Sequence, residues 1–221
     1  MQRYFATIKD NQAFLSELDT HHLLHVMRNR VGDKIEVVDN ATLFLCSIDS
    51  INPLQINVIN KVNNDYKTKD ITLFFSLAKG EKIDFVIQKA TELGAKNVVL
   101  VSTKRCVVKM DNEDFAKKLV RYNKIAKEAS EQSERLDLVN ILGVYDLKHL
   151  PKELLNGHLF VAYEEEKGNT SSFYEDISMI SPDSPVGIII GPEGGFELEE
   201  IKYLNSIGFK SISLGNRILR T

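Results

Sequence analysis

The sequence predicts an α/β protein in two parts, a small β-barrel over residues 1–70 and an α/β domain over residues 71–221. In the first part, short strand-like segments are separated by turn residues. In the second, short apolar segments alternate with amphipathic helices, which indicates a parallel sheet with helices on both faces. The 221-residue chain is 43% hydrophobic and 27% charged, a composition typical of a globular protein and unlike a disordered or fibrous one.

The first part contains three expected strands and one expected helix. The strands are rich in Val, Ile and Phe, are bounded by turn formers, and cover Lys34–Val38, Leu43–Ile48 and Gln55–Val62. A helix is expected over Leu15–Met27, where apolar residues recur at helical spacing. The polar stretch Asn63–Asp70 is the expected linker to the second part.

The second part alternates strands and helices along the chain. Six short segments, several of them almost entirely apolar, are expected as buried strands of a parallel sheet: 71–78, 97–102, 138–142, 158–163, 186–191 and 211–214. Helices are expected over Lys82–Leu93, which Gly94 closes, around Phe115–Ala129, and over Phe196–Ile207.

The net charge of −3 conceals an uneven distribution along the chain. Residues 79–135 carry 13 basic and 9 acidic side chains, whereas residues 145–200 carry 3 basic and 12 acidic ones. A local basic stretch is able to attract a polyanion, because salt screens the more distant acids. The overall balance nevertheless excludes a histone-like or polybasic protein.

Cysteine usage and apolar runs indicate the compartment. Cys46 and Cys106 are far apart and form no CxxC motif, so neither a disulfide framework nor a zinc site is expected. The histidines at 21, 22 and 25 have no neighbouring acidic or cysteine cluster, and no metal is expected there. The N-terminus lacks a signal-peptide core, and no apolar run has the length of a membrane span. We therefore expect a cytoplasmic protein.

The first candidate ligand loop lies in Gly187–Phe196, which reads GIIIGPEGGF. Parallel sheets bind ligands beyond the carboxyl ends of their strands, and paired glycines let the backbone approach a ligand closely. No phosphate-loop motif is present, and Glu193 would repel a pyrophosphate. The loop therefore suits a ligand with hydroxyl, amino or positively charged groups, such as S-adenosylmethionine. A plain strand-to-helix turn with an acid at the helix N-terminus explains the same residues equally well.

The second candidate loop is Ser213–Thr221, SLGNRILRT, which follows the last expected strand. Arg217 and Arg220 bracket the apolar pair Ile218 and Leu219. Apolar side chains beside exposed backbone suit an adenine ring, and arginine binds a phosphate or a developing oxyanion. The alternative interpretation is a helix start with solvated arginines.

The third candidate is the helical segment 121–135, where Glu131, Gln132 and Arg135 share one helix face. Glu131 and Arg135 have the spacing of an ordinary surface ion pair, which is the simplest explanation of both. Gln132 adds nothing to such a pair but is able to read a base edge. Arg105, directly after an expected strand, would face the same ligand edge as the two loops.

Several segments together resemble one known family. They are HHLLHVMRNRVGDKIEVVDN at 21–40, QKATELG at 88–94, KRCVVK at 104–109, EASEQSER at 128–135, GPEGGF and SLGNRILRT. In this order they are similar to the RsmE family of bacterial RNA methyltransferases. Each segment is short, but the ordered set covers nearly the whole chain and is specific.

The resemblance implies a fold and an activity. The fold is that of the SPOUT class: a PUA-like barrel, here 1–70, before an α/β domain, here 71–221, whose C-terminal part forms a trefoil knot. The activity is S-adenosylmethionine-dependent methylation of N3 of a uridine in 16S ribosomal RNA of the small subunit, by a homodimer. Because the family continues after LRT with a further helix, we expect that the chain ending at Thr221 lacks that helix.

The resemblance also implies site residues. The cofactor would be held by Ile190, Gly191, Pro192, Glu193, Gly194, Gly195, Leu214, Gly215, Ile218 and Leu219. Arg105, Glu131, Gln132 and Arg220 would lie toward the RNA, and the basic residues Arg3, Arg28 and Arg30 of the barrel are expected to bind it as well. For catalysis we expect Arg135 or Arg217 to stabilise charge on the uracil oxygens. The N3 proton would pass to a carboxylate, for which Glu193 is the candidate, or to a water.

Two other functions stay open at this point. One is a non-catalytic RNA-binding or ribosome-assembly protein that retains the fold, for which the end at Thr221 is the best support. The retained GPEGG and LGNRILR segments argue against it, since a pure binder would not need them. The other is an enzyme acting on a phosphate-bearing nucleotide, which the missing phosphate loops disfavour.

Overall fold

A computed structural model describes residues 1–64, 67–163 and 170–215 of the chain. The chain divides into two compact units. Unit 1 comprises Met1–Lys67 and Lys127–Leu138, and unit 2 comprises Thr68–Ala126 and Val139–Thr221. The expected division into 1–70 and 71–221 did not include this second segment of unit 1. It joins unit 1 because the end of a long helix and the turn after it pack on the N-terminal strands.

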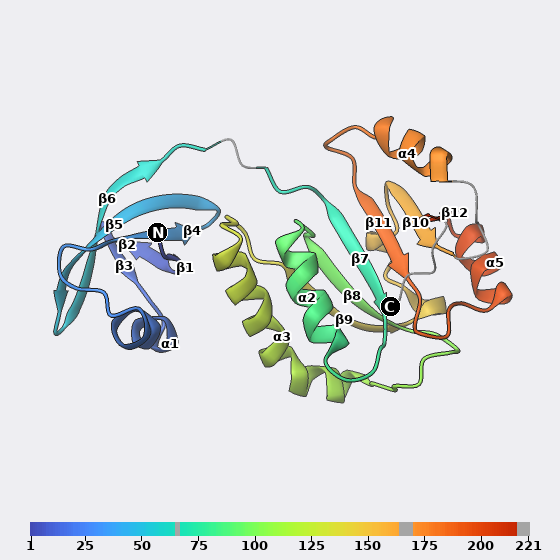
Figure 1. The fold of residues 1–221 in the computed structure, drawn as a ribbon, viewed down its shortest axis with the longest axis horizontal. Coiled ribbons are helices and arrows are strands. Elements are labelled where there is room, and N and C mark those ends of the chain that lie inside the picture. The colour runs from blue at the N-terminus through green and yellow to red at the C-terminus, as the bar shows by residue number, and fades with distance from the viewer. Residues whose placement is uncertain (65–66, 164–169, 216–221) are drawn as a thin grey trace. The chain divides into compact units, whose positions relative to one another are not determined.

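Unit 1 is built on a six-stranded mixed sheet of order β1-β4-β5-β6-β3-β2 (Figure 1). The strands are β1 (Arg3–Phe5), β2 (Thr7–Lys9), β3 (Gln12–Phe14), β4 (Lys34–Asp39), β5 (Thr42–Ile51) and β6 (Leu54–Val62). β1 runs parallel to β4, and the other pairs are antiparallel. Edge strand β2 also contacts β4, so the sheet rolls toward a barrel. The three expected strands are present, and β1 to β3 were not expected.

The expected helix of unit 1 is shorter than predicted and changes type. α1 (Glu17–His21) begins at Ser16, whose hydroxyl accepts a hydrogen bond from the Asp19 N–H. It continues as the π-helical turn η1 (His22–Val26). Leu23 from this turn is fully buried against the barrel core, with Tyr4 and Ile35 among its neighbours.

Unit 2 contains an all-parallel six-stranded sheet of order β12-β10-β11-β7-β8-β9. Its strands are β7 (Ile71–Ser76), β8 (Asn97–Ser102), β9 (Asn140–Asp146), β10 (His158–Ala162), β11 (Val186–Ile190) and β12 (Phe209–Ile212). Each corresponds to one of the six apolar segments of the sequence. The α/β prediction for this part of the chain is therefore confirmed.

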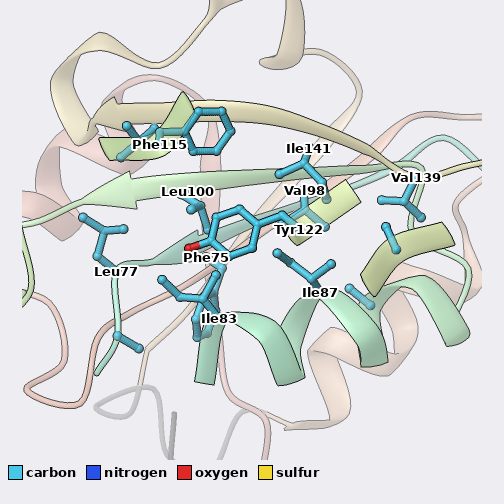
Figure 2. Packing of buried hydrophobic residues seen from close by; sticks show 14 of the residues in the cluster. Phe75, Leu77, Ile83, Ile87, Val98, Leu100, Phe115, Tyr122, Val139 and Ile141 are labelled. Atoms are coloured by element: carbon cyan, nitrogen blue, oxygen red, sulfur yellow. The ribbon is translucent and has the colours of Figure 1, made fainter. Parts of the chain in front are cut away.

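Helices cover both faces of this sheet. α2 (Lys82–Glu92) and the first part of α3 (Asn112–Gln132) lie on one face, where Ile83, Ile87 and Tyr122 pack against Phe75 and the strands beside it (Figure 2). α5 (Leu198–Ser206) lies on the other face, together with the turns η2 (Leu147–His149) and η3 (Lys152–Leu154). α4 (Thr170–Ser178), which the sequence did not predict, contacts β10 through an edge-to-face Phe173–Phe160 pair.

Candidate active site

The two candidate loops start from the same edge of the unit 2 sheet. β10 lies between β11 and β12, and its register places Val161 beside both Ile189 and Ser211. All three strands are parallel, so the loops that follow β11 and β12 leave the sheet at one level. With neighbouring strands about 4.8 Å apart, the two loops begin about 10 Å from each other, a separation that a nucleoside spans.

The GPEGG loop after β11 packs on the aromatic ring of Phe196. A Cβ at Gly191 would lie 3.0 Å and 3.1 Å from two ring carbons of Phe196. Phe196 is 3% exposed in the core cluster that also holds Ile201 and Leu204 of α5. Gly195 has φ +68°, a left-handed conformation that glycine adopts without strain. The sequence therefore needs glycine at both ends of this turn.

The start of α5 is capped within its own sequence. Glu197 at the N-cap and Glu200 three residues later form a capping box, in which each carboxylate accepts a backbone N–H of the other. Glu200 also accepts a hydrogen bond from the Lys104 N–H at 2.8 Å. Carboxylates at this helix N-terminus therefore also anchor the loop that follows β8.

Glu193 is paired with a lysine. Its Oε1 accepts hydrogen bonds from Lys82 Nζ at 2.9 Å and from the Lys79 N–H at 3.3 Å. The Lys82 ammonium holds the pKa of Glu193 below its usual value. This lowered pKa makes Glu193 a poorer proton acceptor than the sequence-based hypothesis requires.

The loop after β8 contacts the GPEGG loop directly. Arg105 donates a hydrogen bond from a terminal nitrogen to the Gly194 carbonyl at 2.9 Å, and a Cβ at Gly194 would lie 3.2 Å from the Arg105 Cβ. Lys104 pairs with Glu197 at 2.8 Å and with Glu199 at 3.0 Å, and these carboxylates raise its pKa. Arg105 thus lies at the ligand edge as predicted, with its side chain exposed.

The loop after β12 is described as far as Gly215. Ser213 is buried, and its hydroxyl bonds to the backbone of Gly215. Leu214 is 45% exposed, and a Cβ at Gly215 would meet no atom of the described residues within 4 Å. The predicted site residues Arg217, Ile218, Leu219 and Arg220 lie outside the described residues.

Two of the basic residues predicted to act on RNA are engaged inside unit 1. Arg3 is 8% exposed, donates to Glu36 at 2.7 Å and 2.9 Å, and also donates to the Glu134 carbonyl. Arg135 is 3% exposed and forms an ion pair with Asp137 at 2.8 Å. Burial and these contacts argue against direct RNA contact by Arg3 and against charge stabilisation on uracil by Arg135.

Glu131 is likewise part of an internal network of unit 1. Lys127 Nζ lies 2.7 Å from a Glu131 carboxylate oxygen and 2.6 Å from one of Asp19, and the Phe5 N–H donates to Glu131. Burial raises the pKa of Glu131. The network fastens the end of α3 to the barrel, which leaves Glu131 badly placed for contact with RNA. Its neighbour Gln132, in contrast, is exposed.

The predicted RNA-binding residues Arg28 and Arg30 are exposed in unit 1. Within the described part of the chain, neither guanidinium has an acidic partner. Arg28 has φ +56°, and Asp33 accepts the Arg30 N–H at 2.8 Å. The short loop therefore presents two unpaired cations on a fixed backbone.

Two features of the ligand edge were not found from the sequence. The loop between β7 and α2, which holds Lys79, lies against the GPEGG loop, as does Lys82 at the start of α2. Tyr163 directly follows β10, between the two candidate loops, and its N–H donates to the Ile212 carbonyl. The loop follows one expected strand, and Tyr163 is the last residue of another. The rule that located the other loops would have included both, had it been applied to every strand of the sheet.

The described residues at this edge offer two features that suit a nucleoside. The exposed Leu214 side chain gives an apolar contact, and among the described residues no atom blocks a close approach to the backbone at Gly215. Residues 1–64, 67–163 and 170–215 contain no group of three or more His, Cys, Asp or Glu side chains able to hold a metal ion. In the same residues, no helix combines the length and the hydropathy of a membrane span.

Comparisons with known proteins give the family. Residues 65–221 match the RNA methyltransferase domain family, and residues 15–59 match the RNA methyltransferase PUA domain family. Ribosomal RNA small subunit methyltransferase E of Bacillus subtilis is 32% identical over 234 residues, covering 100% of this chain and 91% of the relative. That of Mesomycoplasma hyopneumoniae is 32% identical over 225 residues, covering 100% of this chain and 94% of the relative.

Two solved structures have the same fold throughout. A ribosomal RNA small subunit methyltransferase E from Neisseria gonorrhoeae, bound to S-adenosyl methionine, is 25% identical with a TM-score of 0.82, covering 100% of this chain and 92% of that one. A methyltransferase from Legionella pneumophila, in complex with the same cofactor, is 27% identical with a TM-score of 0.84, covering 99% and 90%. The chain thus belongs to the RNA methyltransferase family whose curated members are named ribosomal RNA small subunit methyltransferase E.

Proposed function

We propose that this protein methylates N3 of a uridine in 16S ribosomal RNA of the small subunit, with S-adenosylmethionine as methyl donor. One observation carries the proposal: in a chain of this family, the loops after β11 and β12 leave one sheet edge about two strand spacings apart. Two structural relatives were solved with this cofactor bound. From the membership of the chain in this family, we further propose that it acts as a homodimer in the cytoplasm.

The loop residues of unit 2 would hold the cofactor. The backbone from Gly191 to Gly195 and the Leu214–Gly215 turn offer N–H and carbonyl groups and one exposed apolar side chain. When bound, S-adenosylmethionine supplies a methyl group already activated by its sulfonium. The contribution of the chain is therefore mainly to bind and orient the two reactants.

The uridine requires more from the protein than orientation. N3 carries a proton and becomes a good nucleophile only when that proton leaves, which places negative charge on the neighbouring carbonyl oxygens. A cation close to these oxygens lowers the barrier. Since Arg135 is buried against Asp137, we assign this role to Arg217. A water molecule is the simplest proton acceptor, because Glu193 is already paired with Lys82.

Unit 1 would bind the RNA through its exposed polar residues. Arg28 and Arg30, which have no acidic partner among the described residues, provide cations for phosphates, and Gln132 provides an amide for a base edge. The family match of residues 15–59 to an RNA methyltransferase PUA domain includes both arginines. Phosphate contacts of this kind make the affinity fall steeply with salt concentration.

A binding and turnover experiment tests the proposal. Calorimetry of the full chain with S-adenosylmethionine, S-adenosylhomocysteine and ATP should give saturable binding of the first two and none of ATP. Methylation of small subunits from a strain that lacks the protein, followed by mapping of the modified base, should locate a 3-methyluridine in 16S RNA. RNA binding without cofactor binding would indicate a non-catalytic assembly protein, and tight ATP binding would indicate a nucleotide enzyme.

A further inference from the structure

We propose that Glu193 is a positioning residue, whose carboxylate fastens the GPEGG loop to the loop between β7 and α2. In this role it holds the cofactor-binding backbone in place and does not accept a proton from the substrate. The inference rests on the proposed function, because it assigns Glu193 a part in binding the methyl donor. It replaces the sequence-based hypothesis that Glu193 is the catalytic base.

The geometry of the carboxylate supports this role. A single oxygen, Oε1, accepts from both Lys82 Nζ and the Lys79 N–H. Lys79 lies in the loop after the neighbouring strand β7, and Lys82 is the first residue of α2. β7 and β11 are paired in parallel, with Phe75 beside Ile190, so their two loops leave the sheet side by side. The contact therefore joins two loops that start from adjacent strands.

The N-terminus of α2 favours a carboxylate at the position of Glu193. Among the described residues, Glu81 at the N-cap of α2 makes no side-chain hydrogen bond to the helix N-terminus. A carboxylate near the first turn of a helix is stabilised by the positive end of its dipole. Glu193 brings such a charge from another loop, and Lys82 in the first turn adds a second favourable interaction.

The GPEGG loop is held on three sides as a result. Glu193 links it to the β7 loop, the Gly194 carbonyl accepts from Arg105 in the β8 loop, and the Phe196 ring fills the space below Gly191. Three adjacent strands, β11, β7 and β8, thus share one network at their carboxyl ends. A loop fixed in this way loses little conformational entropy when a ligand binds, which strengthens binding.

The proton-acceptor role fits the same contacts poorly. A general base works best when its pKa lies near the operating pH. The Lys82 ammonium moves the pKa of Glu193 away from that range, to below its usual value. Proton transfer to the carboxylate would also weaken its ion pair with Lys82. The observed pairing suits a group that stays ionised throughout turnover.

A double-mutant cycle on the full-length protein tests the proposal. The variants are Glu193→Gln, Lys82→Met and the two combined, with Glu92→Gln as matched control because it breaks the exposed Lys89–Glu92 pair on the same helix. Calorimetry gives the Kd for S-adenosylmethionine, thermal unfolding checks the fold, and kcat is measured from pH 6 to 9 with both substrates saturating.

The positioning role predicts a particular pattern of results. Each single variant should weaken cofactor binding about two- to fivefold, as expected for a partly exposed ion pair. The Kd of the double variant should not exceed that of the single variant that binds the cofactor less tightly. The kcat should fall less than threefold, with an unchanged pH profile, and Glu92→Gln should match wild type.

Three outcomes would overturn it. One is a loss of roughly 100-fold or more in kcat for Glu193→Gln alone, with an altered pH profile, because that is the signature of a general base. The second is an additive cycle or no change in Kd, since either would mean that Glu193 and Lys82 do not act together. If the wild-type protein does not bind S-adenosylmethionine at all, the proposed function fails together with this inference.

Discussion

The substitution Gly191→Ala would test whether the GPEGG loop is shaped by the ring beneath it. The new Cβ would lie 3.0 Å and 3.1 Å from two ring carbons of Phe196, whereas carbon atoms in favourable contact are about 3.5–4.0 Å apart. The ring is 3% exposed and packs in the core on α5, so it has little room to retreat. Overpacking of this kind typically costs about 1–3 kcal/mol.

The expected result has two parts. For a cost of about 2 kcal/mol, the melting temperature of a domain of this size should fall by about 4–8 °C. If the GPEGG loop moves to relieve the strain, the Kd for S-adenosylmethionine should rise about tenfold for each 1.4 kcal/mol of binding free energy that is lost. Thermal unfolding and calorimetry on the same preparation measure the two effects.

A second variant gives the control. Phe196→Leu removes the Cε2 and Cζ atoms that the new Cβ would meet and replaces the rigid ring by a shorter side chain able to turn its Cδ atoms away, at the cost of a small cavity of its own. The combined Gly191→Ala/Phe196→Leu variant should therefore be more stable than the sum of the two single losses predicts, by about 1 kcal/mol or more. Wild-type stability and affinity in Gly191→Ala, or strict additivity in the double variant, would refute the reasoning.

Three further predictions concern unit 1 and the cysteines. Arg28→Ala should lower the slope of log affinity for RNA against log salt concentration by about one unit, as measured by filter binding from 50 to 300 mM salt. Arg3→Ala should instead cost about 3 kcal/mol of stability in urea unfolding, because the largely buried Glu36 carboxylate loses its partner. Equal effects of the two substitutions in both assays would contradict the assignment. Burial, with nearby carboxylates, raises the pKa of Tyr4 to about 12, so wild-type stability should fall above pH 10, where the tyrosine of the unfolded chain ionises first. Urea unfolding from pH 8 to 11 should show a smaller fall in Tyr4→Phe than in the wild type. Burial likewise raises the pKa of Cys46 to about 11, and in the native protein alkylation followed by peptide mass spectrometry should modify Cys106 first, with Cys46 reacting only after unfolding; early labelling of Cys46 would show that this part of the barrel opens.

The strands of unit 2 were predictable because most of them are buried on both faces, and the edge strands β9 and β12 keep buried apolar residues on at least one face. Such strands appear in the sequence as short apolar segments between turn residues, and all six were located from that signal. β1, β2 and β3 were not located because three residues are too few to show alternation. The boundary near residue 70 followed from composition, whereas the return of residues 127–138 to unit 1 depended on tertiary contacts.

The positions of the candidate loops were also predictable, but the partners of their side chains were not. The carboxyl ends of strands gave the GPEGG loop, the loop after β12 and Arg105 directly. Glu193 lies 111 positions from Lys82, and Arg3 lies 33 positions from Glu36, so no local pattern relates them. The basic side chain of Arg3 suggested RNA binding, and the family resemblance placed Glu131 and Arg135 near the substrate. The contacts show all three in internal pairs.

The amino-acid sequence alone predicted the α/β fold class and the sheet edge at which a ligand is expected, because apolar periodicity and glycine placement are local properties of the chain. The family followed from the resemblance of an ordered set of short segments, which is also a property of the sequence alone. Only the tertiary structure decided which charged groups are free to meet a ligand. Whether an arginine or a carboxylate is available depends on its burial and on an opposite charge within a few ångströms, and folding brings that charge from a distant part of the chain. Arg28 and Arg135 have the same side chain, yet one is exposed and unpaired among the described residues and the other is buried in an ion pair.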